Sequence, residues 1–181
     1  MRLSLQKAKG SWRLSAMEEI HVQLLNQAAG DASERESAAG RARFLASPLN
    51  EEDAVLEEEF LEDWQEFVAP DLHEKFTNEA SVFQRDLQAI ETYRVGTNRE
   101  RELFRVTLPL AHGFDWFSAL NQARIMLDLR YKFHDEADEF VAELPPEVLG
   151  EMDPQERLAA YLRYDFYCMI QEWIVRNVLS E

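Results

Sequence analysis

The sequence has 181 residues, of which 46% are hydrophobic, and its formal net charge at pH 7 is −16. This hydrophobic content is enough for a packed core and excludes a globally disordered chain. The strong negative charge repels nucleic acid backbones and anionic lipids, so we expect neither nucleic acid nor a membrane as a partner. The single cysteine, Cys168, excludes an intramolecular disulfide and is typical of a protein of the reducing cytoplasm.

The first 14 residues predict a β-hairpin, because apolar and polar residues alternate on both sides of Gly10. Ser15 is followed three residues later by Glu18, which is the spacing of a capping box, so we expect a helix to begin there and end near residue 30. Small and polar residues dominate the start of the next stretch, and we interpret residues 30–48 as a surface loop.

An acidic helix is predicted after this loop. The sequence contains no Lys or Arg between Arg43 and Lys75, and acids in the first turn of a helix suit the helix dipole. Two interpretations stay open: the acids form a solvated helix face, or they form a docking surface for a basic partner. The candidate surface comprises Glu51, Glu52, Glu58, Glu59 and Glu62.

Apolar residues in the same segment indicate which side of this helix is buried. The spacing is helical and predicts a stripe that faces the core, made of Val55, Leu56, Phe60, Trp64, Phe67 and Val68. Pro70 lacks a backbone N–H, and we expect it to break or kink the helix there. A second helix is then predicted up to about residue 93, packed antiparallel or steeply crossed against the first.

Residues 102–109 alternate like a strand, and we predict that this strand joins the hairpin in a three-stranded antiparallel sheet. A helix starting at Asp115 and a short acidic helix at 135–144 follow. Asp153 as cap and Pro154 at the first helical position then begin the last helix. We predict a single domain over residues 1–181, of mainly α (α+β) class. The hairpin and loop precede a helical core at 50–181, in a compact bundle of about six helices with a small N-terminal antiparallel sheet.

Catalytic and metal-binding signatures are not found. One Glu-x-x-His pair, Glu18 and His21, falls short of the two pairs of a di-iron site, and the zinc, phosphate-loop, dinucleotide and nucleophile-elbow patterns do not occur. Cys168 lies in an apolar run, which is typical of core packing. We therefore expect no catalytic residue, no metal and no cofactor, and we favour a protein that is not an enzyme.

Two aromatic-rich helices carry polar residues that need partners. Asn121, Arg124 and Asp128 share one helix face, and so do Asp165 and Glu172. If these faces meet, Arg124 lies against Asp165 or Glu172, because a guanidinium binds carboxylates through two hydrogen bonds. The arrangement is a buried network that fixes helix register, a pocket for an anionic group, or an exposed pair. The candidate residues are Asn121, Arg124, Asp128, Asp165, Gln171 and Glu172.

The same segments resemble a known family. The pattern comprises Trp116, Leu120-Asn121, Arg124, Arg130-Tyr131, Tyr164-Asp165 and Gln171-Glu172, with Arg43-Phe44-Leu45, Pro48 and Glu58-Glu59-Phe60 in the middle section. It resembles, over nearly the whole chain, a bacterial domain family of unknown function whose genes often neighbour that of the ClpS-type adaptor of the Clp protease. The chain differs at Gln122, where the family often has Asp, and at 127–130, where it often has Leu-Gly-Thr-Arg. The resemblance implies a context of regulated proteolysis and brings no catalytic residues.

We therefore predict a cytoplasmic, non-enzymatic interaction or regulatory protein with an unidentified protein partner. The link to regulated proteolysis is what the resemblance implies. The alternative is a small anionic-ligand-binding protein or enzyme that uses Asn121, Arg124 and Asp165. A third interpretation is that the last helix packs against its own copy and forms a homodimer.

Overall fold

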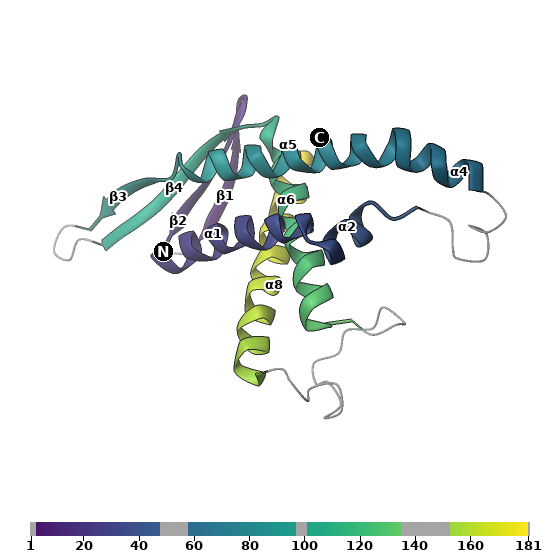
Figure 1. Ribbon diagram of the computed structural model, residues 1–181. Coiled ribbons are helices and arrows are strands. Elements are labelled where there is room, and N and C mark those ends of the chain that lie inside the picture. The colour runs from purple at the N-terminus through teal and green to yellow at the C-terminus, as the bar shows by residue number, and fades with distance from the viewer. Residues whose placement is uncertain (1–2, 48–57, 97–100, 135–152, 181) are drawn as a thin grey trace.

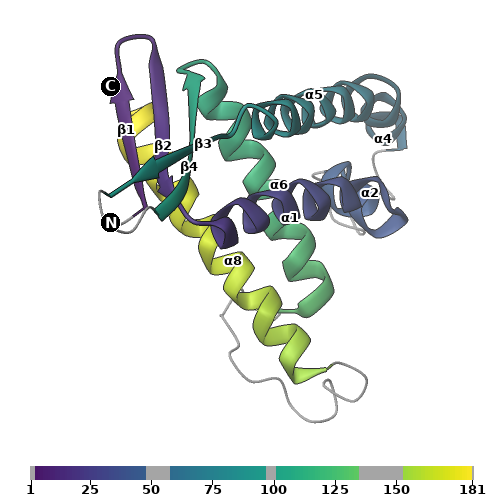
Figure 2. The same cartoon turned by 90° about the vertical axis from the view of Figure 1, so that its left-hand side faces the viewer.

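A computed structural model of the protein describes residues 3–47, 58–96, 101–134 and 153–180 (Figure 1). Several predictions lie outside these residues: the acids Glu51 and Glu52, the apolar Val55 and Leu56, and the acidic helix at 135–144. The side chain of Glu58 also lies outside the description. Within them, a small antiparallel sheet lies at one end of a mainly helical body, as Figures 1 and 2 show. The mainly helical class and the small antiparallel sheet are confirmed.

The sheet has four strands in the order β1-β2-β4-β3. The predicted pairing of the hairpin with the strand at 102–109 is present, because Trp12 lies opposite Leu108. The prediction of a helix up to about residue 93 is wrong: that helix ends at Leu87, and the following residues form an extra strand. Thr92 and Val95 are β-branched, which favours extended backbone. The strands are β1 (Ser4–Ala8), β2 (Ser11–Met17), β3 (Glu91–Val95) and β4 (Arg101–Pro109).

Strand β2 extends past the expected helix start at Ser15. Its register with β4 shifts between Leu14 and Met17, which is a β-bulge, and Ala16 within it has a φ of 57°. Helix α1 (Glu19–Ser33) therefore begins later, with Glu18 as its cap, and the backbone N–H of Glu18 donates to His21 Nδ1 at 2.9 Å. The expected capping role of Ser15 is wrong because the bulged strand contains this residue.

The expected surface loop at 30–48 is wrong for most of its length. Helix α1 continues to Ser33, a 3₁₀ turn η1 (Glu34–Glu36) follows, and α2 (Ala38–Phe44) begins after Ser37. The Ser37 hydroxyl accepts the backbone N–H of Gly40 at 3.1 Å and caps α2. A side chain at Gly40 would overlap the backbone carbonyl of Arg35. The small residue here allows close packing of two helical turns.

Residues 58–87 form one continuous helix, which we call the acidic rod. It comprises α4 (Glu58–Asp63), a π-helical turn η2 (Trp64–Val68) and α5 (Ala69–Leu87). The prediction of two separate helices, packed antiparallel or steeply crossed on either side of Pro70, is wrong. Pro70 occupies the first turn of α5, and the π turn before it carries the bond from the Ala69 N–H to the Trp64 carbonyl. In Figures 1 and 2, the α4 end of the rod extends beyond α6 and α8.

Helices α6 (His112–Tyr131) and α8 (Pro154–Ile174) run antiparallel, and α8 continues in a π turn η3 (Val175–Leu179). Arg157 Nε donates to the Tyr131 carbonyl at 3.1 Å at one end of the pair, and Gln171 Nε2 donates to the Phe117 carbonyl at 2.9 Å towards the other. Where about six helices were predicted, the described residues form five: α1, α2, the acidic rod, α6 and α8.

Three fully buried aromatic residues join the sheet to the helices. The Trp116 ring meets the Trp12 ring edge-on at 5.2 Å between centroids and the Phe83 ring at 4.7 Å. Such perpendicular pairs place the positive edge of one ring on the negative face of the other. These contacts fix β2, α5 and α6 around one point of the core.

Gly40 and Gly30 offer a matched test of the close packing at α2. Gly40→Ala is expected to lower the free energy of unfolding by about 2 kcal/mol, because the added methyl group would displace the Arg35 backbone. Gly30 lies in α1 with nothing within 4 Å of an added methyl group, so Gly30→Ala should raise the free energy of unfolding by about 0.8 kcal/mol. Urea denaturation measures both values, and changes of the same sign would contradict this account.

Candidate functional site

Arg124 is the centre of the polar cluster predicted between the two long helices. Its Nη1 donates to Gln171 Oε1 at 2.6 Å, and its Nη2 donates to the Tyr164 hydroxyl at 2.9 Å. The guanidinium also lies 4.8 Å from the centroid of the Tyr164 ring, which is a cation–π contact. Arg124 on α6 is therefore held by two residues of α8, one of which, Tyr164, was part of the family pattern but was not selected as a site residue.

The carboxylates expected beside Arg124 lie elsewhere. Arg124 forms no ion pair within the described residues; Asp165 is exposed, and Glu172 pairs with Arg176 on its own helix. Asp128 instead closes the end of α6, where its Oδ1 accepts the backbone N–H groups of residues 133 and 134. Asn121 is half-buried and does not bond Arg124. Gln171 and Arg124 are therefore the two candidates that the fold brings together.

The Arg124 cluster resembles a lock between helices more closely than an open binding site. Its Nε is buried and has no hydrogen-bond partner within the described residues, so this atom is shielded from solvent. The Gln171 side chain is also buried, and it connects Arg124 to the Phe117 carbonyl. The network joins side chains and backbone of both helices, which fixes their register.

A second polar network, which the sequence analysis missed, joins α1 to α8. Asp31 is buried, accepts the Tyr167 hydroxyl at 2.9 Å and pairs with Arg163 at 3.2 Å. Burial raises the pKa of the Asp31 carboxyl, and the Tyr167 hydrogen bond and the Arg163 charge oppose this shift. The i, i+4 pair formed by Arg163 and Tyr167 was visible in the sequence, but the carboxylate lies more than a hundred residues away.

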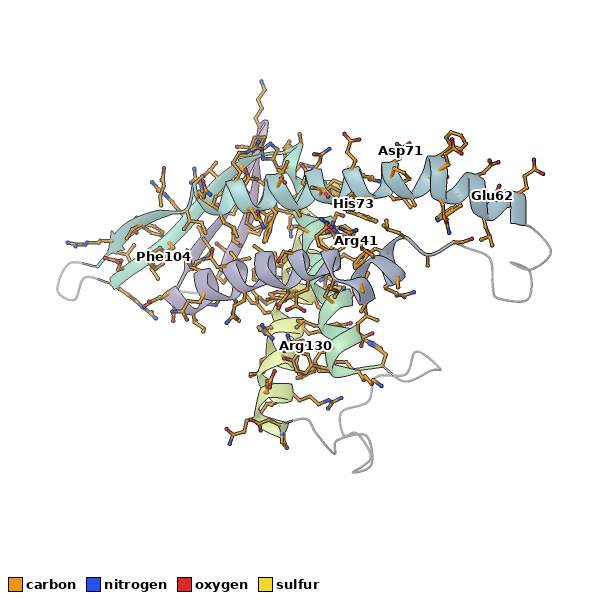
Figure 3. All side chains as sticks on the ribbon, in the orientation of Figure 1. Arg41, Glu62, Asp71, His73, Phe104 and Arg130 are labelled. Atoms are coloured by element: carbon orange, nitrogen blue, oxygen red, sulfur yellow. The ribbon has the colours of Figure 1, made fainter. Side chains whose placement is uncertain are left out.

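A third network surrounds Arg35, which is buried between η1, α5 and α6. Its Nη1 donates to Gln122 Oε1, and its Nη2 donates to Glu36 Oε1 at 2.6 Å. The hydrogen bond from Arg35 lowers the pKa of the Glu36 carboxyl. Arg41 also pairs with Glu36 at 3.3 Å, and Figure 3 shows Arg41 and His73 close to this junction. Gln122 is thus a neutral partner of a buried arginine.

The stripe predicted to be buried along the acidic rod is largely exposed. The exposed fractions are 38% for Phe60, 59% for Phe67 and 37% for Val68. Trp64 is half-buried, because its Nε1 donates to the Leu45 carbonyl at 3.1 Å beyond the end of α2. We call this surface the docking face; it comprises Phe60, Phe67 and Val68 with the exposed acids Glu59, Glu62, Glu66 and Asp71.

The potential metal ligands and the single thiol can be placed only for the described residues. Within the described ranges, no group of three or more His, Cys, Asp or Glu side chains is arranged to hold a metal ion. Burial raises the pKa of the Cys168 thiol, with the nearby Arg124 charge opposing the shift, so the thiol stays protonated near neutral pH. Among the same residues, no helix combines the length and apolar character needed to cross a membrane.

Comparison with known proteins identifies the family. Residues 4–178 match a domain of unknown function, DUF2017. The chain belongs to this family. The match includes the sheet, the acidic rod and the α6–α8 pair, so the prediction of a domain of unknown function over nearly the whole chain is confirmed. No curated protein matches the chain, and no solved structure matches it.

Removing Arg124 tests the lock. Arg124→Ala is expected to lower the free energy of unfolding by about 2 kcal/mol, because it removes two hydrogen bonds from a charged donor and leaves the buried Gln171 oxygen without that donor. The matched control is Arg176→Ala, which removes an exposed arginine and should change this free energy by less than about 0.5 kcal/mol. Urea denaturation of both variants measures these free energies of unfolding. A decrease below about 0.5 kcal/mol for Arg124→Ala would contradict the lock.

The raised pKa of Asp31 predicts a pH dependence of stability. Folded Asp31 keeps its proton to higher pH than an unfolded Asp, whose pKa is about 3.9. Between these two pKa values the folded state binds more protons than the unfolded state. The folded state therefore loses stability as the pH rises through the folded pKa. Asp31→Asn can still accept the Tyr167 hydroxyl and lacks this titration. Its stability relative to the wild type should therefore increase from about pH 4 to about pH 7. Urea midpoints at both values measure the difference, and a constant difference would refute the prediction.

Proposed function

We propose that this protein is a non-enzymatic interaction module that binds a positively charged protein partner on the docking face. The observation that carries the proposal is the exposure of Phe60, Phe67 and Val68, at helical spacing, on a helix that is otherwise acidic. An exposed apolar patch bordered by polar residues is typical of a protein–protein interaction site.

The energetics favour Phe67 as the main contact. Fully burying a phenylalanine side chain contributes about 1.5–3 kcal/mol, and Phe67 still has 59% of its surface exposed. The four surrounding acids attract a basic partner and repel acidic ones, although salt screens this attraction beyond about 8 Å at physiological ionic strength. Apolar contact therefore supplies affinity, and the acids supply selectivity.

Two contacts hold the acidic rod against the α2 region, and a surface that is positioned before binding loses less entropy on binding. Trp64 donates to the Leu45 carbonyl, and the Phe44 and Phe76 rings meet at 5.5 Å, so α2 supports the rod from one side. Figure 3 places Glu62 and Asp71 on the part of the rod that extends away from α6 and α8. A partner can reach this helix without displacing the core.

We infer that the partner belongs to the machinery of regulated proteolysis in the cytoplasm. The support is the resemblance to a bacterial family whose genes often neighbour that of the ClpS-type adaptor, together with the single cysteine. An acidic, apolar docking face suits an adaptor-like or regulatory role, because such a role requires binding and no chemistry.

Two exposed apolar residues test where partners bind. Phe67 and Leu158 are each 59% exposed, on the acidic rod and on α8. Phe67→Ser should reduce the recovery of a specific partner from bacterial lysate at least about tenfold, whereas Leu158→Ser should leave it unchanged. Immobilised wild type and both variants are compared by quantitative mass spectrometry, and purified ClpS-type adaptor and Clp chaperone are tested directly.

The opposite pattern would contradict the docking face. Partner loss with Leu158→Ser and not with Phe67→Ser would place the interface on α8. Sedimentation of the same variants measures self-association, because a second copy packed on α8 would dissociate only in the Leu158 variant. Equal recovery of every protein by both variants would remove the support for an interaction on either surface.

The alternative function, a small anionic-ligand-binding protein or enzyme, has one supporting observation. Arg124 is a cation whose hydrogen bonds all go to neutral side chains. Asn121 and Asp165 would complete such a site. If inorganic phosphate raised the melting temperature of the wild type and not that of Arg124→Lys, this alternative would be favoured over the lock.

A further inference from the structure

A second exposed apolar surface lies where η3 meets the start of α6. Phe114 is 49% exposed, Val175 44% and Leu179 39%. A methyl group added at Gly113 would lie only 2.7 Å from a methyl carbon of Val178, so η3 packs closely against the first turn of α6. Phe114 follows Gly113 in that turn. The three exposed residues therefore lie around one junction of the fold.

Basic side chains border this junction. Lys75 Nζ of α5 lies 5.7 Å from the centroid of the Phe114 ring, which is a cation–π contact. Lys7 Nζ of β1 donates to the backbone carbonyl that follows η3 at 3.0 Å. Arg176 lies in η3, where it is 70% exposed and also pairs with Glu172. We call this surface the C-terminal patch; it comprises Phe114, Val175 and Leu179 with Lys7, Lys75 and Arg176.

The C-terminal patch and the docking face are complementary. Each has three exposed apolar residues, bordered by cations on the patch and by four acids on the docking face. Apolar surface is removed from water when the two meet, and the opposite charges at their rims favour one orientation over others. The whole chain carries a formal charge of −16, so two copies repel each other unless surfaces of opposite charge meet. This complementarity within one chain favours a second copy as the occupant.

We propose that the protein associates head to tail, with the C-terminal patch of one copy on the docking face of a second copy. This inference rests on the proposed function, because it names one positively charged partner of the docking face. The contact joins two different surfaces, so a pair of copies leaves one docking face open. A second copy competes with any other partner for Phe67, and self-association therefore reduces partner binding as the protein concentration rises.

Sedimentation velocity of the full chain at several concentrations measures the dissociation constant of self-association. Phe67→Ser on the docking face and Phe114→Ser on the C-terminal patch should each weaken self-association at least about tenfold, because each removes a large apolar contact. The matched control is Leu162→Ser, at a position that is 58% exposed on α8 and outside both surfaces. It should weaken self-association less than about twofold.

Charge reversal tests the basic rim of the patch. Lys75→Glu should weaken self-association at least about threefold, because it places a carboxylate against the acids of the docking face. Arg130→Glu makes the same change of charge at a position that is 56% exposed near the other end of α6, and should weaken it less than about twofold. Lys75→Glu also replaces Phe114→Ser if circular dichroism shows that the latter is unfolded.

A mixture of Phe67→Ser and Phe114→Ser gives the sharpest test. The first variant keeps an intact C-terminal patch, and the second keeps an intact docking face. The mixture should therefore associate with a dissociation constant within about threefold of the wild-type value, although neither variant associates alone at the same concentration. A contact between two copies of the same surface, such as α8 on α8, is not restored in this way.

The outcomes distinguish this inference from the proposed function. A wild type that stays monomeric up to about 100 μM, equal weakening by Leu162→Ser, or a mixture that does not associate overturns the head-to-tail contact. If Phe67→Ser still reduces partner recovery in that case, the docking face stands with another partner. If the mixture associates and Phe67→Ser leaves the recovery of every other protein unchanged, the second copy is the occupant of the docking face, and the partner from the proteolysis machinery is lost.

Discussion

The fold depends on one contact, at which Trp116 joins three elements. Its ring lies between Trp12 of β2 and Phe83 of α5, and its Nε1 donates to the buried Asp86 carboxylate at 2.9 Å. Asp86 is also within hydrogen-bond distance of His112 at the start of α6. A buried indole N–H and a buried carboxylate satisfy each other here, so the cost of burying these two polar groups is offset within the apolar core. The sheet, α5 and α6 cannot shift separately without breaking this junction.

Several other buried charged side chains are also satisfied by hydrogen bonds to a different element. Asp31, Arg35 and Arg157 are all nearly inaccessible, and each is bonded to groups on another element. Such pairs give specificity more reliably than stability, because desolvation consumes much of the attraction. In a helical body whose helices cross at steep angles, these bonds select one crossing among several that apolar packing alone would permit. Glu79 of α5 follows the same pattern, because its Oε2 accepts the Ser118 hydroxyl of α6.

Much of the architecture was predictable from local signals. The hairpin around Gly10, the strand at 102–109 and the helix after Asp153 all follow from alternation and capping, which depend on neighbouring residues. The continuity of the acidic rod across Pro70 is harder to predict from the sequence. Pro70 looked like a break because it cannot donate a hydrogen bond, but the π turn before it accommodates that loss within a continuous helix. The small residues near Gly40 looked like a loop, and only the close approach of Arg35 explains them as packing.

The candidate site was predictable only in part, for a physical reason. Helical spacing selects Arg124 with Asp165 and Glu172 opposite it, and Gln171 beside them as a further hydrogen-bond partner. The choice of Tyr164 over Asp165 depends on the rotation of α8, which no local pattern specifies. The pattern of Phe60, Trp64 and Phe67 is equally ambiguous. Apolar residues at helical spacing are required both for a helix that covers a core and for a helix that binds another protein.

The solvent exposure of the apolar residues distinguishes between these two roles on the acidic rod. A core-facing stripe would have lost its accessible surface to other elements, whereas Phe67 keeps more than half of its own. The acids around Phe67 also require contact with water or with a basic partner, because removing them from water without counter-charges would be costly. In the function that we propose, the same helix combines an apolar surface that favours association with charges that restrict which partners can associate. This restriction explains how an exposed aromatic surface is compatible with a strongly charged, acidic chain.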